Sequence, residues 1–151
     1  YEFKRPSTIT IDRSQPLNPA FLLFGQGDGW DVGKEDKASL AIRELDLTKV
    51  KLVKIGGGAE RRKRLKKPGR ILLDGQICEA IWLDKLQIPE HWKKDENGEN
   101  AIIFFDGSEI RDGLGELYIL GLSWDGSEWE IDHWLDEARE DEHLSAVIEV
   151  K

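Results

Sequence analysis

Apolar and polar residues alternate on both sides of one Asp-Gly pair in the stretch "YILGLSWDGSEWEIDHW", residues 118–134. A period of two is typical of strands with one buried face, and Asp-Gly favours a two-residue hairpin turn. Such a turn pairs Leu122 with Trp129, whereas a shift by one residue would place Leu122 opposite a glutamate. We therefore predict that Trp129 and Trp124 face the core. Trp134 falls on the opposite face, where another element covers it or it lines a pocket.

Short apolar or alternating stretches elsewhere predict the remaining strands. They cover residues 7–12, 38–45, 49–55, 70–73, 101–105, 108–111 and 144–150. The stretch 25–37 is rich in Gly and Asp without a period, which predicts a loop. The expected fold class is α+β, with a mostly antiparallel, twisted sheet of about six or seven strands.

One well-formed helix is expected to pack on one face of this sheet. Asp74 provides an N-cap, and the following apolar residues recur at helical spacing. These residues are Ile77, Cys78, Ile81, Trp82 and Leu86. The helix should end before Pro89, and Asn18 predicts a second, short helix over residues 19–24.

Length and composition predict a single domain over residues 1–151, and 39% hydrophobic residues suffice for one core. Tyr1–Phe3 is interpreted as a cloning remnant. We expect no membrane span and no signal peptide, because no apolar stretch is long enough for either. The single cysteine, Cys78, excludes an intrachain disulfide and a cysteine-based zinc site, so a cytoplasmic location is expected.

Charge is distributed unevenly along the chain. The net charge is -8, which disfavours a general nucleic-acid or membrane binder. Segment 61–70, "RRKRLKKPGR", nevertheless contains 7 Lys and Arg without an acidic residue, leaving 15 basic against 30 acidic residues elsewhere. The protein is therefore an acidic body with one basic segment.

This basic segment follows three glycines at 56–58 and is predicted to form an exposed helix over residues 59–67. A glycine-rich turn before a helix presents backbone N–H groups to phosphate or carboxylate. The Walker pattern is absent, and Arg61 occupies the position of the third glycine of the dinucleotide fingerprint, so no cofactor is expected. The alternatives are a solvated helix and a contact surface for a partner or anion. The candidate contact residues are Gly57, Gly58, Arg61, Arg62, Lys63, Arg64, Lys66, Lys67 and Arg70.

Residues suited to catalysis are few. The histidines are dispersed without a metal-binding spacing, and no Gly-x-Ser-x-Gly occurs. Cys78 is expected to be a buried, inert thiol. His133, predicted beside Tyr118, is the candidate acid or base with Asp132, and its alternative role is structural. Four acidic residues in the Gly/Asp-rich stretch, Asp28, Asp31, Glu35 and Asp36, do not have the spacing of a calcium loop.

Several stretches of the chain are similar, in the same order, to a family of small uncharacterised bacterial proteins. They include "EDKASLAIRELDLTKVKL", "RRKRLKKPGRILLDGQICEAIW", "IPEHWK", "IIFFDGSEIRDGLGELYILGLSWDGSEWEIDHWL" and "SAVI". The ending "DEAREDEHLSAVIEVK" is more acidic and has less tryptophan than that family's usual ending. The resemblance implies a stand-alone bacterial protein, in some cases from a mobile gene cassette, and it implies no activity.

The predicted function is that of a small, non-enzymatic binding or interaction module. Its partner is expected to be a second copy, giving a homo-oligomer, or an acidic protein. Two alternatives remain: a small enzyme that uses His133 with nearby carboxylates, and a nucleic-acid or anion binder that acts through segment 61–70.

Overall fold

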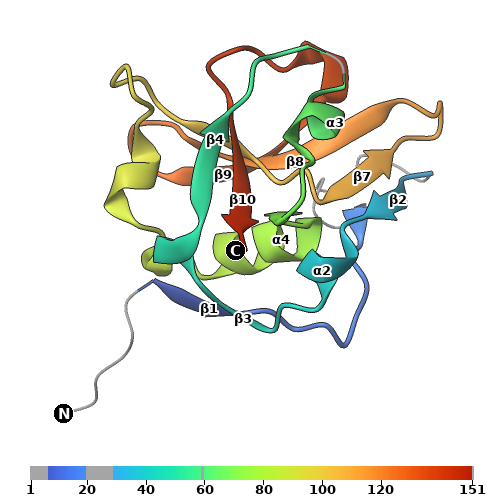
Figure 1. Cartoon of the computed structure of the whole chain (residues 1–151), viewed down its shortest axis with the longest axis horizontal. Coiled ribbons are helices and arrows are strands. Elements are labelled where there is room, and N and C mark those ends of the chain that lie inside the picture. Colours follow the sequence, from blue (N-terminus) through green and yellow to red (C-terminus); the bar gives the residue numbers. More distant parts are fainter. Residues whose placement is uncertain (1–6, 20–28, 59, 151) are drawn as a thin grey trace.

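The computed structural model describes residues 7–19, 29–58 and 60–150, and it is an α+β fold built around a curled, mixed sheet (Figure 1). Within these residues, eight strands form the sheet: β2 (Asp31–Glu35), β4 (Lys51–Lys54), β5 (Arg70–Leu72), β6 (Ile102–Phe104), β7 (Ser108–Arg111), β8 (Leu117–Trp124), β9 (Trp129–Leu135) and β10 (Leu144–Glu149). A separate two-stranded sheet pairs β1 (Thr8–Thr10) with β3 (Glu44–Asp46). The predicted fold class is confirmed, with more strands than expected.

Two strands, β8 and β10, make most of the pairings of the sheet. The order is β2-β7-β8-β6-β10-β4, and β9 pairs with β8 while β5 pairs with β10. Strands β6 and β7 pair with successive parts of β8, and β10 contacts β4, β5 and β6. The β10–β6 pair is parallel, and the other pairs of the described sheet are antiparallel. Strands β8 and β10 therefore each pair with three neighbours and hold the sheet together.

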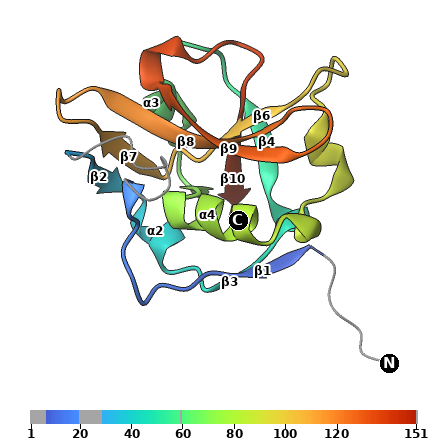
Figure 2. The ribbon, with the colours of Figure 1, turned by 180° about the vertical axis from the view of Figure 1, so that it is seen from behind.

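Helix α4 (Gly75–Leu83) lies between the large sheet and the β1–β3 pair (Figure 2). Its Ile77, Cys78 and Ile81 side chains are fully buried in the main core, as predicted. Leu86 is 96% exposed, which contradicts the prediction that it belongs to the same apolar face. The helix ends at Leu83, and the 3-10 turn η2 (Lys85–Gln87) points Leu86 toward solvent.

The short helices are α2 (Lys37–Leu40) and α3 (Arg61–Leu65), and further 3-10 turns are η1 (Leu47–Lys49), η3 (Glu90–Lys93) and η4 (Asp136–Ala138). Two predictions near α2 are wrong. Residues 38–45 begin as a helix rather than a strand, because the Asp36 carboxylate accepts the backbone N–H groups of Ala38 and Ser39. Part of the predicted loop is strand β2, which pairs with β7. The helix expected at 19–24 lies largely outside the described residues.

The β8–β9 hairpin keeps the predicted faces in a different register. Trp124 pairs with Trp129, and Leu122 pairs with Ile131. The turn has four residues rather than two, because the Asp125 carboxylate accepts the N–H groups of both Ser127 and Glu128 at 2.7 Å. A register shift of two residues preserves which side chains share a face. Trp129 is accordingly buried at 6% exposure.

Trp134 lies on the opposite face of β9 and is covered there, as expected. Its ring packs at 4.8 Å from the His143 ring and at 6.0 Å from the Phe104 ring, measured between centroids. Both aromatic faces of this hairpin therefore contribute to packing. Among the described residues, no helix is long and apolar enough to span a membrane.

Candidate interaction surface

The three glycines at 56–58 bring the chain against the connection between β9 and β10. The Gly57 N–H donates to the Asp141 carboxylate at 2.8 Å, and the Gly58 N–H donates to the Arg139 carbonyl at 2.8 Å. A Cβ atom at Gly57 would lie 2.4 Å from that carbonyl, so only glycine permits this approach. These N–H groups, expected to face an external anion, are therefore occupied by the chain itself.

Helix α3 is shorter and more buried than the exposed helix expected over residues 59–67. It covers Arg61–Leu65, and the side chains of Arg61 and Leu65 have no exposed surface. Leu65 packs with Leu72 of β5 and Val147 of β10 in a second, small apolar cluster. A single leucine therefore anchors α3 to the sheet, which the low apolar content of the segment did not suggest.

Arg61 reaches inward from α3 and binds mainly backbone carbonyl groups. Its guanidinium donates to the carbonyls of Gly56 at 2.6 Å and Glu140 at 3.4 Å, to the carbonyl of His143, and to the Ser145 hydroxyl at 3.2 Å. Burial lowers the pKa of Arg61 to about 10. The group stays protonated at neutral pH and closes the β4–α3 loop onto the start of β10.

A buried ion-pair network continues from Ser145. The Asp106 carboxylate, after β6, accepts the Ser145 hydroxyl at 2.7 Å and an Arg139 N–H at 2.6 Å. Arg139 also pairs with Asp136 at 2.5 Å. Two cations and two carboxylates thus balance each other at the junction of three chain segments. We call this group the arginine centre, and its members are Arg61, Asp106, Asp136, Arg139 and Ser145.

The other arginines of the basic segment also bind the chain itself. Arg62 donates to the Asp106 carbonyl at 2.7 Å and lies 3.8 Å from the Glu109 carboxylate. Arg64 is exposed, yet its guanidinium donates to the Gly57 carbonyl at 2.6 Å. Arg70 pairs with Glu149 at 2.9 Å. The four arginines therefore fix the conformation of the segment.

The lysines of the segment behave differently. Lys63, Lys66 and Lys67 are exposed, and their side chains make no hydrogen bond or close ion pair within the described part of the chain. Lys67 adds only a longer-range attraction to Glu149. A lysine ammonium is a compact, strongly hydrated charge, whereas the planar guanidinium of arginine suits buried, multiple contacts. We call these three residues the lysine edge. They are the members of the predicted contact segment whose side-chain charges are available to a partner.

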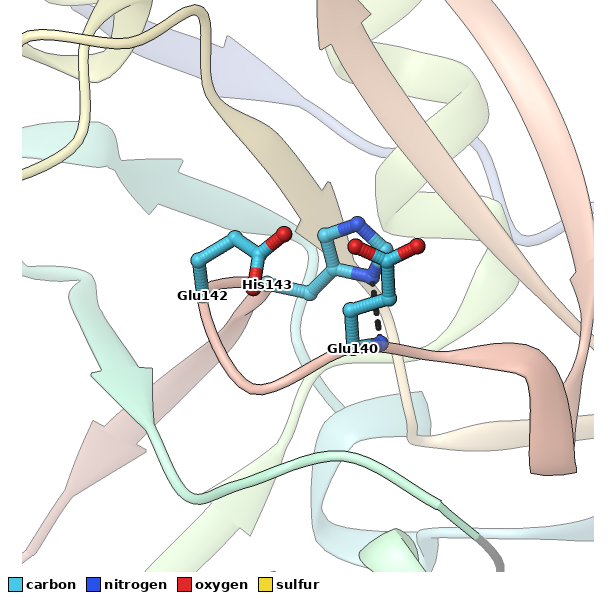
Figure 3. A group of neighbouring side chains, drawn as sticks. All are labelled: Glu140, Glu142 and His143. Carbon is cyan, nitrogen blue, oxygen red and sulfur yellow. Dashed lines mark hydrogen bonds between the residues drawn. The ribbon is translucent and has the colours of Figure 1, made fainter.

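A turn beside the arginine centre brings Glu140, Glu142 and His143 together (Figure 3). Their potential ligand atoms lie within 4.8 Å of one another. The His143 Nδ1 atom accepts the Glu140 backbone N–H at 3.0 Å, so the neutral ring carries its hydrogen on Nε2. Neither ring nitrogen then offers a free lone pair to a metal ion. The arrangement is that of a hydrogen-bonded turn.

The titration of this turn follows from its surroundings. Burial lowers the pKa of His143; the Glu142 carboxylate offsets part of this effect, and the cationic Arg61 and Arg139 lower the pKa further. The hydrogen bond between the two carboxyl groups raises the pKa of Glu140 and lowers the pKa of Glu142. The histidine is therefore held neutral beside two arginines.

His133 and Asp132, the candidate catalytic pair, point to opposite faces of β9 because they are adjacent in a strand. The His133 ring packs against Tyr118 at 5.4 Å and Trp30 at 5.6 Å between centroids, and burial lowers its pKa. Asp132 accepts the Ser123 hydroxyl at 3.4 Å. His133 does not line five of the best-defined cavities of the described residues, including the one beside Trp30. The geometry gives this pair no common substrate position.

Two further candidates are accounted for by internal contacts. Cys78 is fully buried, and burial raises the pKa of its thiol above the ordinary value. In the acidic stretch, Glu35 accepts the Ser108 hydroxyl at 2.8 Å, and Asp36 caps α2 and accepts the Leu72 N–H at 3.0 Å. Asp28 lies outside the described residues. Those contacts occupy two of the four carboxylates considered for calcium.

The sequence did not identify the acidic partners of the basic segment, which are Glu109 for Arg62 and Glu149 for Arg70. One signal was present: the acidic stretch 136–142 has the opposite charge to segment 61–70, which suggests pairing within one chain. No protein-family model matches the sequence, and no curated protein or solved structure shows significant similarity to it. Function must therefore be inferred from the surface itself.

Proposed function

We propose that this protein is a non-enzymatic interaction module that binds an acidic protein partner through the lysine edge. The observation that carries the proposal is that the arginines and the lysines of segment 61–70 make different contacts. Its arginines bind the chain's own carbonyl and carboxylate groups, whereas Lys63, Lys66 and Lys67 face solvent. A rigid support with free charges is suited to electrostatic recognition.

The charge of the rest of the molecule favours an acidic protein over nucleic acid. Three lysines within five residues form a small basic surface, while the chain as a whole has a net charge of -8. A polyanion that covers a wide surface is repelled by this body, whereas a compact acidic patch contacts the lysine edge alone. Nucleic-acid binding is the alternative that the test must distinguish.

The test uses a fluorescent polyglutamate peptide, with binding followed by anisotropy at low and physiological salt. The triple variant Lys63→Gln, Lys66→Gln, Lys67→Gln should weaken binding by about tenfold, since each exposed ion pair contributes about two- to fivefold. The matched control replaces Lys34, Lys37 and Lys49, which are equally exposed and lie elsewhere, with glutamine. Glutamine retains much of the length of the lysine side chain. The arginines of the segment are left unchanged because they hold its conformation.

The control decides between local and general electrostatics. A selective loss in the first variant supports the lysine edge as the contact surface. Equal weakening in both triple variants would overturn the proposal, because it would show that only net charge matters. Tighter binding of a DNA duplex than of the peptide, again lost in the first variant, would instead indicate a nucleic-acid binder.

A further inference from the structure

A groove of about 400 Å³ separates the outer face of α4 from the segment that follows β1. Three carboxylates line it, from Asp12, Glu79 and Asp84, and its lining residues include no lysine or arginine. The nearby Arg13 side chain is turned inward, where it pairs with Asp74 at 2.6 Å. The groove is therefore acidic, and no basic side chain among its lining residues balances the three carboxylates.

The groove also has apolar walls. Pro16, Ala80 and Leu83 line it, and the Leu83 side chain is 67% exposed. Leu86, 96% exposed, lies just beyond the end of α4. Exposed large apolar side chains rimmed by charge are typical of contact surfaces. A partner for this groove should therefore combine positive charge with a small apolar group.

The lysine edge has this combination. Pro68 follows Lys67 and is exposed, and Val150 is 55% exposed. The Val150 N–H donates to the Gly69 carbonyl at 2.6 Å, which places Val150 beside the turn that ends the basic segment. Positive charge and apolar surface thus occur side by side. They match the negative charge and exposed leucine of the groove.

We propose that the acidic groove binds the lysine edge of a second copy of this chain. This inference rests on the proposed function, because it identifies the acidic partner of the lysine edge. Figures 1 and 2 show α3 above α4 and the β1–β3 pair below it, with the C-terminal end drawn at the level of α4. The groove and the lysine edge are different surfaces, so one such contact between two copies is heterologous and leaves one groove and one edge free.

The experiment is sedimentation velocity over a concentration series at low and high salt. The wild type should form species larger than a monomer at low salt, and high salt should dissolve them because the charges are exposed. The groove variant Glu79→Lys, Asp84→Lys and the edge variant Lys66→Glu, Lys67→Glu should each be monomeric. Each charge reversal should weaken association by about two- to fivefold more than neutralisation of the same side chain would, because it replaces attraction with repulsion.

Mixing the two variants provides the sharpest outcome. Every contact between a groove variant and an edge variant is attractive, so the mixture should recover self-association at low salt. The control Glu44→Lys, Glu137→Lys reverses two exposed carboxylates elsewhere and should associate like the wild type. Circular dichroism checks folding, and Asp12→Lys serves as a second groove variant if the first does not fold.

Two results would overturn the inference. A wild type that remains a monomer at every concentration at low salt has no such contact. Association that survives in both variants uses another surface. If the wild type is monomeric yet binds polyglutamate through the lysine edge, the inference fails and the proposed function stands. If polyglutamate does not bind selectively through the lysine edge but the mixed variants still associate, the proposal of a general acidic partner fails. The lysine edge then recognises only a second copy of this chain.

Discussion

Two stretches of the chain have the same pattern, Leu-Leu-Asp-Gly at 72–75 and Phe-Phe-Asp-Gly at 104–107, and both place a fully buried aspartate beside an arginine. The two groups are Asp74 with Ser39 and Arg13, and Asp106 with Ser145 and Arg139. The turns lie against each other, since the Gly107 N–H donates to the Leu73 carbonyl at 2.9 Å. One short motif thus gives two neighbouring Asp–Ser–Arg centres.

The two centres differ in what surrounds the arginine. Arg13 binds both oxygens of one carboxylate, at 2.6 and 3.1 Å, and its other N–H groups bind carbonyls and Gln76. Arg139 contacts two carboxylates, and Arg61 joins the same centre from the basic segment. The first centre is closed within the fold, whereas the second supports the lysine edge. The same three residue types therefore stabilise the fold in the first centre, and in the second centre they also support the exposed lysine edge.

The largest effects should come from removing either aspartate. Asp74→Ala and Asp106→Ala should each lower the free energy of unfolding by about 3–5 kcal/mol, because each leaves a buried arginine without its main partner. Urea denaturation measures both losses. A loss below about 1 kcal/mol in either variant would contradict the assignment of that centre as a buried ion pair.

Asparagine variants sharpen this comparison because they keep the shape and remove the charge. Asp106→Asn should speed hydrogen exchange of the Gly58 amide, whose acceptor is the Arg139 carbonyl. Asp74→Asn should leave that amide protected. Equal acceleration in both variants would mean that the two centres act as one unit.

The glycines of the two motifs should give the next largest difference. A Cβ at Gly107 would lie 2.2 Å from the Leu72 carbonyl oxygen, which is backbone, whereas a Cβ at Gly75 would meet a Leu17 methyl group at 2.5 Å. Gly107→Ala should therefore cost about 1–3 kcal/mol, and Gly75→Ala less, because the Leu17 side chain can move. Thermal unfolding of both variants checks which substitution costs more stability. A larger loss for Gly75→Ala than for Gly107→Ala would contradict the prediction.

Acid should destabilise the fold through His143, which lies beside the second centre. Its pKa in the folded state lies below the ordinary 6.5, so the unfolded chain binds a proton first as the pH falls. This stabilising contribution is complete above pH 6.5 and is lost as the pH falls through the folded pKa. The free energy of unfolding should therefore decrease with acidification in this range.

His143→Asn retains an acceptor near the Nδ1 position and removes the titrating ring. It should flatten the pH dependence measured by urea denaturation, with the remaining slope due in part to His133, whose pKa burial also lowers. An unchanged slope would show that His143 does not report on the second centre.

The smallest effect on stability is expected at the lysine edge. Replacing Lys63, Lys66 and Lys67 with glutamine should change the free energy of unfolding by less than about 0.5 kcal/mol, because these side chains are exposed and make no hydrogen bond or close ion pair within the described residues. The melting temperature checks this value. A clear loss of stability would mean that the lysines, like the arginines, are part of the support.

Patterns with a local cause were predictable from the sequence. The period of two placed Trp129 inward, and the apolar spacing after Asp74 defined α4. The hairpin register was missed because a carboxylate-capped turn of four residues replaced the two-residue turn. Strand β2 was missed because its pairing with β7 compensates for its polar sequence.

The buried arginines could not be found from local patterns. Arg61 and Ser145 are 84 residues apart, and Arg139 and Asp106 are 33 residues apart. An arginine is buried only where distant partners satisfy its donors, so its own neighbours in the sequence give no indication. The sequence therefore indicated the candidate surface only as a segment. The division between arginine and lysine required the structure.

The position of β10 has a consequence for folding during synthesis. This strand contacts β4, β5 and β6, and residues 143 and 145 also bind Arg61. Until residues 143–149 leave the ribosome, those three strands lack their common neighbour and Arg61 lacks two of its acceptors. Strands paired across such sequence distances form slowly and expose their edges meanwhile. The sheet can therefore close only when this strand has paired with β4, β5 and β6.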